Sequence, residues 1–446
     1  MMRRKGYIVI SVLVLFSLIY GCLERTPENE GGISRIKPDI QSAGKQGNDF
    51  NIIFILVDTL RADHMGAYGY PRNTSPNIDD FASNNILFEE VRSQASCTFP
   101  SVNSILTSRY SFNFHGQNDT GFPDNVLTIA EILKKNDYST SAITSSPIVR
   151  DTPVKLKGGY YKGGYGNGFE EFVEDITWKS AKIVNIRAKK LLDKFENSSK
   201  PFFLYLHYTE PHGPYKPPKT FTKKFATYPS PPVFKQRYLV GDRPVSPTAV
   251  IKGLKANPGW ELSGEGLEYM VDNYDDEIAF FDQEFKGLMD ELSRRGLMEN
   301  TMIIVASDHG EGFMEHDFLK HCVHVYDEEA KVPLIMRIPG TGHQRIDGVV
   351  QNIDIMPTIL DYVGIDCGCA LDGRSLRSSI ESGNPSENYA YTEQDEFKSV
   401  YDGRHKLIKD ISTGEYFLYD IENDPKEKHN IFSRNPIVKG KLEFSY

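Results

Sequence analysis

The sequence predicts an α/β fold with a large, mostly parallel central sheet flanked by helices. Short apolar runs rich in β-branched and aromatic residues have the character of buried strands, and they alternate with segments of helical periodicity. The composition is that of an ordinary globular protein, with 39% hydrophobic and 25% charged residues. A chain of 446 residues with this composition can form a sizeable core, and its length favours more than one structural unit.

The predicted elements alternate along the chain from residue 51 onward. In chain order they are a strand at 51–57, a helix at 101–108, a helix at 127–137, a strand at 138–144, a helix at 180–196, a strand at 201–206, a helix at 267–296, and strands at 301–307 and 332–340. We interpret the many acids of the helix at 267–296 as a solvated face. The Gly-rich run at 157–172 lacks the lysine and hydroxyl of a phosphate loop, so we expect a surface loop there.

The N-terminus has the features of a secretion signal. A basic cluster at residues 3–5 precedes an apolar stretch at 7–20. This stretch is shorter than the roughly 20 residues of a bilayer span, so we expect residues 1–22 to be a signal peptide with lipid attached to Cys22. Tyr20 is bulky for such a cleavage site, and an uncleaved membrane anchor is the alternative. Both interpretations predict an exported protein at the outer face of the cell membrane.

The remaining chain divides into three predicted parts. Residues 23–49 are polar and without periodicity, as in a flexible tether. A catalytic domain is expected at 50–365 and a small C-terminal α+β subdomain at 366–446, with a hairpin at 404–432 that turns near Gly414. The net charge of -10 and the lack of a basic stripe argue against a nucleic-acid partner.

The run SCTFPSVNSILTSRY at residues 96–110 carries the most specific signal. It resembles the sulfatase-family signature CxPSRxxxLTGR, of the alkaline phosphatase superfamily, with Thr98 in the family's Cys or Ser position two residues before Pro100. In that family the cysteine becomes formylglycine. Here Cys97 stands one residue too early and Val102 replaces the arginine of the modification pattern. We therefore expect a side-chain hydroxyl as the nucleophile, in a subgroup that lacks the formylglycine signature.

A threonine hydroxyl is weakly nucleophilic and needs a metal or a base to activate it. The alternative role for Thr98 is that of a helix cap. The predicted strands at 51–57, 201–206 and 301–307 end at acids or histidines, and ligands bind outside the carboxyl ends of strands in open α/β sheets. The family resemblance implies one divalent cation, and the residues in the matching positions are Asp58, Thr98, Asp308 and His309.

The oxygen and nitrogen donors of this set suit Mn²⁺ or Zn²⁺ at least as well as Ca²⁺. Calcium sulfatases usually carry a second Asp where this chain has Thr59, and an Asn where it has His309. Both departures point away from a standard calcium sulfatase.

The resemblance also supplies candidates for binding and protonating the ester. His212 lies between Pro211 and Pro214, like a family histidine that contacts the ester oxygens, whereas His207 is either functional or structural. His321 matches the place of a second basic residue, with Lys320 as the alternative. Arg109 closes the signature, and it either tunes Thr98 or ties its helix to the loop of Asp58. We expect structural roles for Arg61, His64 and His324. His316 either stabilises a turn or faces the substrate.

Two further expectations concern the surroundings of these residues. The Pro-, Gly- and Lys-rich segment at 215–263 follows His212 directly, which favours a lid that shapes the substrate site. Five cysteines outside the cytoplasm permit disulfides, and we hypothesise that Cys97 pairs with Cys322 because their neighbours Thr98 and His321 both belong to the proposed site.

Together these features predict a metal-dependent ester hydrolase at the cell surface, with a sulfated or phosphorylated small molecule, glycan or lipid as substrate. Thr98, Val102, Thr59 and His309 favour phosphate esters over sulfate esters. The alternatives are transfer of a phospho-alcohol group to a surface glycan or lipid, and a non-catalytic binding protein.

Overall fold

The computed structural model describes residues 49–110, 122, 126–152, 154–156, 159–161, 163–222, 224, 225, 247–256, 261–384, 389–434 and 442. The expected signal peptide with Cys22, most of the tether and much of the expected lid lie outside the described residues. Within the part that is described, no helix combines the length and the apolar character needed to cross a membrane.

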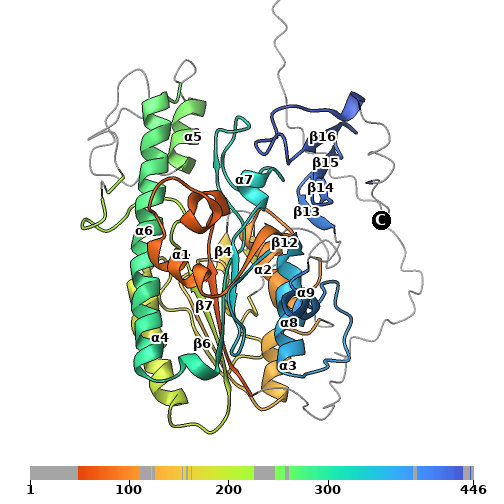
Figure 1. Ribbon diagram of the computed structural model, residues 1–446. Coiled ribbons are helices and arrows are strands. Elements are labelled where there is room, and N and C mark those ends of the chain that lie inside the picture. Colours follow the sequence, from red (N-terminus) through yellow and green to blue (C-terminus); the bar gives the residue numbers. More distant parts are fainter. Residues whose placement is uncertain are drawn as a thin grey trace, which may run out of the picture. The chain divides into compact units, whose positions relative to one another are not determined.

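An eight-stranded sheet forms the centre of the fold (Figure 1). Its strands lie in the order β12, β2, β11, β8, β1, β7, β3, β6. Neighbours are parallel except around β11, which is antiparallel to both β2 and β8. The predicted large, mostly parallel sheet is therefore confirmed. The strands are β1 (Asn51–Val57), β2 (Ile86–Arg92), β3 (Ser139–Thr144), β6 (Glu171–Val173), β7 (Phe202–Tyr208), β8 (Thr301–Ser307), β11 (Leu334–Arg337) and β12 (Gln344–Gln351).

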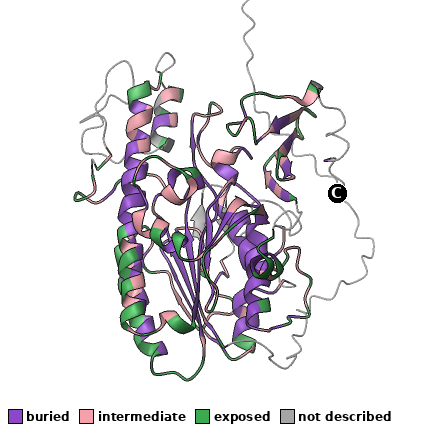
Figure 2. Cartoon of the chain, in the orientation of Figure 1, coloured by how far each residue is buried: buried purple, intermediate pink, exposed green. Residues whose placement is uncertain are grey.

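Helices cover both faces of this sheet because successive side chains of each strand point to opposite faces. In β1, Phe54 and Leu56 pack into one core with α2, α3, α8 and α9, and Ile55 and Val57 pack into the other with α1, α4 and α6. Figure 2 shows the buried strands between the two helical layers. The helices are α1 (Pro76–Ser83), α2 (Thr98–Thr107), α3 (Ile129–Lys135), α4 (Ala181–Phe195), α5 (Pro247–Ala256), α6 (Gly264–Arg294), α7 (Asp327–Ala330), α8 (Ile355–Tyr362) and α9 (Arg377–Ser382).

The C-terminal part forms a four-stranded antiparallel sheet. The predicted hairpin is confirmed, since β15 and β16 pair across a turn in which Gly414 has φ 74°. This is the left-handed region that favours glycine. The strands are β13 (Ala390–Gln394), β14 (Phe397–Tyr401), β15 (His405–Asp410) and β16 (Tyr416–Asp420).

Two sequence interpretations were wrong. The acids of α6 do not form a solvated face, because Asp275 is buried and binds His64, Tyr70 and Arg72, and other acids of this helix are buried as well. The Gly-rich run is not simply a surface loop. It contains β5 (Gly159–Tyr161), which pairs with β4 (Val154–Leu156), and the side chain of Tyr165 is buried.

Candidate active site

The register of three neighbouring strands brings the predicted strand-end residues together. β1 lies between β7 and β8, and Val57 is opposite both Tyr208 and Ser307. Asp58 and Asp308 follow these paired positions directly. The backbone turns sharply after Asp58, where Thr59 has φ 59° and its amide donates to Asp308 Oδ1 at 3.1 Å. The two carboxylates are therefore fixed at the same edge of the sheet.

Thr98 lies at the same edge of the sheet, where it is the first residue of α2. The N-cap position belongs to Cys97, and the buried Thr98 hydroxyl lies 3.1 Å from His309 Nε2 instead of capping the helix. Ser101, one turn further along α2, donates to the backbone oxygen of Asp308 at 2.6 Å. This bond holds the start of α2 against the end of β8.

The hydrogen bonds of His309 define its tautomer. Its Nδ1 lies 2.9 Å from the Gly310 carbonyl oxygen, which can only accept, so Nδ1 carries the proton. Burial lowers the pKa of His309, which keeps the ring neutral at neutral pH. The lone pair of Nε2 therefore faces Thr98 and lies 3.8 Å from Asp58 Oδ1 and 3.5 Å from Asp308 Oδ2. Orientation by a backbone carbonyl is the usual arrangement of a metal-binding histidine.

The donor set fits a divalent cation. Asp58, Asp308 and His309 each offer one atom, and these atoms lie within 4.8 Å of one another. Asp58 Oδ1 and Asp308 Oδ2 are buried without a hydrogen-bond partner, which is costly for carboxylates unless a cation lies between them. Burial, followed by the charges of Asp308 and Glu311, raises the pKa of Asp58 well above its usual value. A bound cation would offset this repulsion.

His207 extends the same cluster. It lies on β7 opposite Leu56, and its Nε2 is 3.9 Å from Asp58 Oδ2 with no hydrogen-bond partner. Its Nδ1 is bonded to the Tyr205 hydroxyl at 3.0 Å. Burial lowers the pKa of His207 to about 4, so its ring is neutral near neutral pH. The sequence left its role open, and the structure places it beside the predicted metal ligands.

The structure also brings His212 and His321 to this site. The ring of His321 lies 4.6 Å from that of His309 and 5.0 Å from that of His212, centroid to centroid. His212 is half-buried, and its ring nitrogen Nδ1 is buried. Burial lowers the pKa of His212 to about 3, and the neighbouring His321 contributes a smaller effect. Burial and the charge of Lys320 lower the pKa of His321 to about 3 as well. Both rings are therefore neutral in the free protein.

Glu311 is a site residue that the sequence did not reveal. It is buried, accepts a hydrogen bond from His321 Nδ1 at 2.9 Å, and accepts another from the Tyr215 hydroxyl at 2.9 Å. Because His321 donates its Nδ1–H to Glu311, the lone pair on His321 Nε2 is available. The only sequence signal was the position of Glu311 two residues after His309.

Arg109 is not brought to these residues. It follows the C-terminal end of α2, about 15 Å along the helix from Thr98 at 1.5 Å per residue. Its side chain binds Asp372 at 3.1 Å and the Ala370 carbonyl at 3.3 Å. This guanidinium therefore ties α2 to the segment before α9, and not to the loop of Asp58.

The residues expected to be structural, and His316, have structural contacts. Arg61 is buried between Asp63 and Glu315. The two nitrogens of His316 face Glu328 and the Glu427 carbonyl, and His324 packs on Phe397. His64 binds Asp275, as described for α6.

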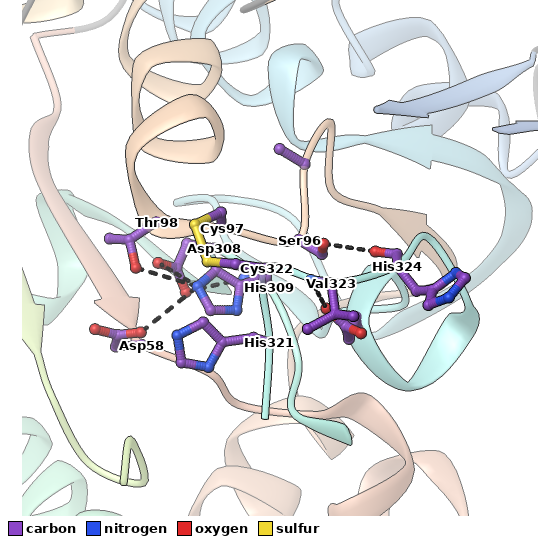
Figure 3. The surroundings of a disulfide bond; sticks show 12 residues. Asp58, Ser96, Cys97, Thr98, Asp308, His309, His321, Cys322, Val323 and His324 are labelled. Carbon is purple, nitrogen blue, oxygen red and sulfur yellow. Dashed lines mark hydrogen bonds and ion pairs between the residues drawn. A yellow bond between two sulfur atoms is a disulfide. The ribbon is translucent and has the colours of Figure 1, made fainter. Parts of the chain in front are cut away.

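A disulfide between Cys97 and Cys322 confirms the hypothesised pairing (Figure 3). It joins the N-cap of α2 to the residue after His321, and Cys322 N donates to the Ser96 carbonyl at 2.8 Å. Thr98 and His321 are thus connected through adjacent residues. A second disulfide joins Cys367 to Cys369, for which the sequence had suggested no pairing.

Comparison with known proteins identifies the family. The sulfatase family model matches residues 50–365, so the chain belongs to the sulfatase family. A model described as N-sulphoglucosamine sulphohydrolase, C-terminal, matches residues 314–442. The matched regions cover both the central sheet and the C-terminal antiparallel sheet.

Three relatives illustrate the range of the similarity. The chain is 24% identical to an arylsulfatase of Clostridium perfringens, over 86% of this chain and 90% of the relative. It is 25% identical to a multifunctional alkaline phosphatase superfamily protein of Trinickia caryophylli, over 85% and 91%. A protein solved in complex with its substrate D-glucosamine-2-N,6-O-disulfate has the same fold, with a TM-score of 0.69, 20% identity, and coverage of 89% of this chain and 96% of that one.

Proposed function

We propose that this sulfatase-family hydrolase cleaves sulfate esters, with the Thr98 hydroxyl as nucleophile and one divalent cation as cofactor. The contact of Thr98 Oγ1 with His309 Nε2 at 3.1 Å, beside two carboxylates with unpartnered oxygens, carries the proposal. Family membership and the arylsulfatase relative support sulfate as the group that is cleaved.

The proposed reaction passes through a covalent ester of Thr98. Thr98 Oγ1 gives its proton to solvent water, forms a bond to sulfur and displaces the alcohol, so the bond between sulfur and the leaving oxygen breaks and that oxygen takes a proton from His212 or His321. Water then hydrolyses the threonine ester and releases sulfate. The first amides of α2 and the positive end of its dipole favour an anionic group beside Thr98.

Asp58, Asp308 and His309 would hold the cation, and its proposed identities are Mn²⁺, Zn²⁺ or Ca²⁺. When bound, such a cation lowers the pKa of a contacting hydroxyl and polarises an ester oxygen. His309 has one lone pair on Nε2, so at any moment it either accepts the Thr98 hydrogen or binds a cation.

His212 and His321 are the proposed proton carriers. Both imidazoles are neutral in the free protein, because their pKa values are lowered to about 3. The negative charge of a bound ester favours the protonated ring, so a proton can be taken up together with the substrate. That proton is then available to the leaving oxygen, a step worth about 10²- to 10⁴-fold in rate.

Charge also favours a sulfate ester over a phosphate monoester. The two carboxylates neutralise a divalent cation, the neighbouring imidazoles are neutral, and the charge of Lys320 near His321 is opposed by the carboxylate of Glu311, so the described site has little positive charge to spare. A sulfate monoester carries one negative charge, fewer than a phosphate monoester near neutral pH. Phosphate esters are the second candidate, supported by Thr98 in the nucleophile position and by the multifunctional relative.

The proposal is tested by comparing wild type with Thr98→Ala and Thr98→Ser on matched aryl sulfate, phosphomonoester and phosphodiester substrates, each with added Mn²⁺, Zn²⁺ or Ca²⁺. We expect Thr98→Ala to lower kcat by more than about 10³-fold and Thr98→Ser to retain part of the activity. Thr107→Ala, at the other end of α2, is the matched control. Full activity of Thr98→Ala would exclude the hydroxyl as nucleophile, and activity unaffected by a chelator would exclude the cation.

We also propose export and lipid attachment at Cys22. Two disulfides fit an oxidising compartment, because disulfides are rare in the cytosol. We expect Cys22→Ala to move the full chain from the membrane fraction to the soluble fraction of its cell. An unchanged distribution would favour the uncleaved anchor, and a cytosolic location of wild type would contradict export.

A further inference from the structure

Trp178 combines two unfavourable features on the surface of the protein. The residue is 50% exposed, the highest value among the large hydrophobic residues that the structure describes. Its backbone has φ 56°, a left-handed conformation that residues with a Cβ rarely adopt. A hydrogen bond from Trp178 N to the Ser145 carbonyl at 2.8 Å holds this conformation. Such strain is concentrated at functional sites, because the fold has to maintain it.

The position of Trp178 connects it to the candidate active site. Its indole lies 5.1 Å from the ring of His212, which lies 5.0 Å from the ring of His321. The ring of His309, whose Nε2 contacts Thr98, follows at 4.6 Å from His321. A continuous series of ring contacts therefore leads from an exposed indole to the nucleophile, and His212 lies between the indole and the reacting atoms.

We propose that Trp178 stacks against a six-membered ring carried by the leaving alcohol of the substrate. This inference rests on the proposed ester cleavage at Thr98, because His212 is the proposed proton donor to the leaving oxygen. A leaving alcohol beside His212 extends toward the exposed indole. The indole face has a negative quadrupole and a large apolar area, which attract the C–H face of a pyranose or the edge and face of an aryl ring. Acyclic alcohols lack such a face.

The test compares three sulfate esters that differ in the leaving alcohol: glucosamine 6-sulfate, an aryl sulfate and an acyclic alkyl sulfate. We expect Trp178→Ala to increase the KM for a ring ester, relative to the KM for the acyclic ester, by about tenfold. Trp178→Phe should restore most of this preference. The ring substrate whose KM increases more in Trp178→Ala shows whether the indole stacks on a sugar or on an aryl group.

Trp178→Gly separates a binding role from a structural one. Glycine adopts positive φ without strain, so this variant should keep its melting temperature while losing the ring preference. The control is Ile186→Ala, which removes another exposed hydrophobic side chain on α4. It should change neither the melting temperature nor the ratio of KM values for ring and acyclic esters. An unchanged KM ratio in Trp178→Ala and Trp178→Gly would overturn the inference.

A binding measurement distinguishes this outcome from failure of the proposed function. If wild type cleaves none of the esters, the proposed function fails, and the inference is tested in Trp260→Phe, which leaves Trp178 as the single tryptophan. Quenching or a spectral shift of its fluorescence by glucosamine 6-sulfate or the aryl sulfate, but not by methyl sulfate, supports ring stacking. An equal response to all three ligands, or no response, contradicts it.

Discussion

Glu311 shows how a buried neighbour directs a catalytic candidate. Its carboxylate accepts from His321 Nδ1 and from the Tyr215 hydroxyl, so the imidazole keeps one orientation and one tautomer. A carboxylate in this position also stabilises the imidazolium that forms when the ring takes up a proton. Glu311 is therefore a positioning residue in the proposed reaction.

We predict that Glu311→Gln lowers kcat by about 10- to 100-fold with little change in KM, because an amide can reverse the hydrogen bond and select the wrong tautomer. Steady-state kinetics on an aryl sulfate measure both constants. Tyr215→Phe removes only the second hydrogen bond of Glu311 and should cause a smaller loss. Wild-type kcat in Glu311→Gln would show that His321 needs no orienting carboxylate.

The sequence predicts those site residues that directly follow a strand. Asp58 and Asp308 follow apolar runs that end abruptly, and strand register then brings them together. Glu311 could not be predicted in the same way. Its contact with His321 depends on how the chain folds back through the hairpin of β9 (Gly312–Phe313) and β10 (Leu319–Lys320). A single acid in such a segment has no periodicity that would identify its partner.

At the scale of elements, periodicity predicts a helix better than it predicts the surroundings of its polar face. The pattern predicts α6, but it does not show that the acids of this helix are buried. In the structure Asp282 accepts from the first amides of α1, and Glu277 accepts from the backbone of Lys216. These partners lie 61 or more residues away in sequence, so local reasoning could not distinguish buried acids from solvated ones.

The disulfide between Cys97 and Cys322 joins two elements that carry site residues. We predict that the double variant Cys97→Ser, Cys322→Ser lowers the free energy of unfolding by about 2–5 kcal/mol, because the bond closes a loop across a sequence separation of 225. Activity should fall as well, since α2 and the segment of His321 lose their covalent connection. Chemical denaturation and kinetics under non-reducing conditions measure the two effects.

The second disulfide provides a matched control. Cys367 and Cys369 are two residues apart, so their bond restricts the unfolded chain much less. The variant Cys367→Ser, Cys369→Ser should therefore lose less stability and keep its activity. Equal losses in the two double variants would show that loop closure does not explain the contribution of the bond at the site.

At the scale of the whole described fold, charged side chains connect the C-terminal sheet to the central sheet. Asp327, the first residue of α7, binds Arg92 at the end of β2 and Lys406 on β15, at 2.8 and 2.7 Å. Lys406 also binds Glu427 at 3.0 Å. Arg92, Lys406 and Glu427 are buried and the side chain of Asp327 is only 11% exposed, so loss of one partner leaves the others without compensation. The charged residues are far apart in sequence, which is why the sequence predicted the small subdomain but not its attachment.

This network predicts a specific dependence of stability on pH. Burial alone would raise the pKa of Asp327, but Arg92 and Lys406 outweigh it and lower the pKa well below 3.8. A carboxyl group whose pKa is lower in the folded state stabilises the fold above its unfolded pKa, and this contribution is lost as the pH falls below about 4.

Asp327→Asn should therefore lower the free energy of unfolding by about 3 kcal/mol at pH 7 and by progressively less as the pH falls below about 4. Urea denaturation of wild type and variant across this range measures the difference, with the exposed Glu415→Gln as control. A constant difference at all pH values would mean that the charge of Asp327 does not hold the two sheets together.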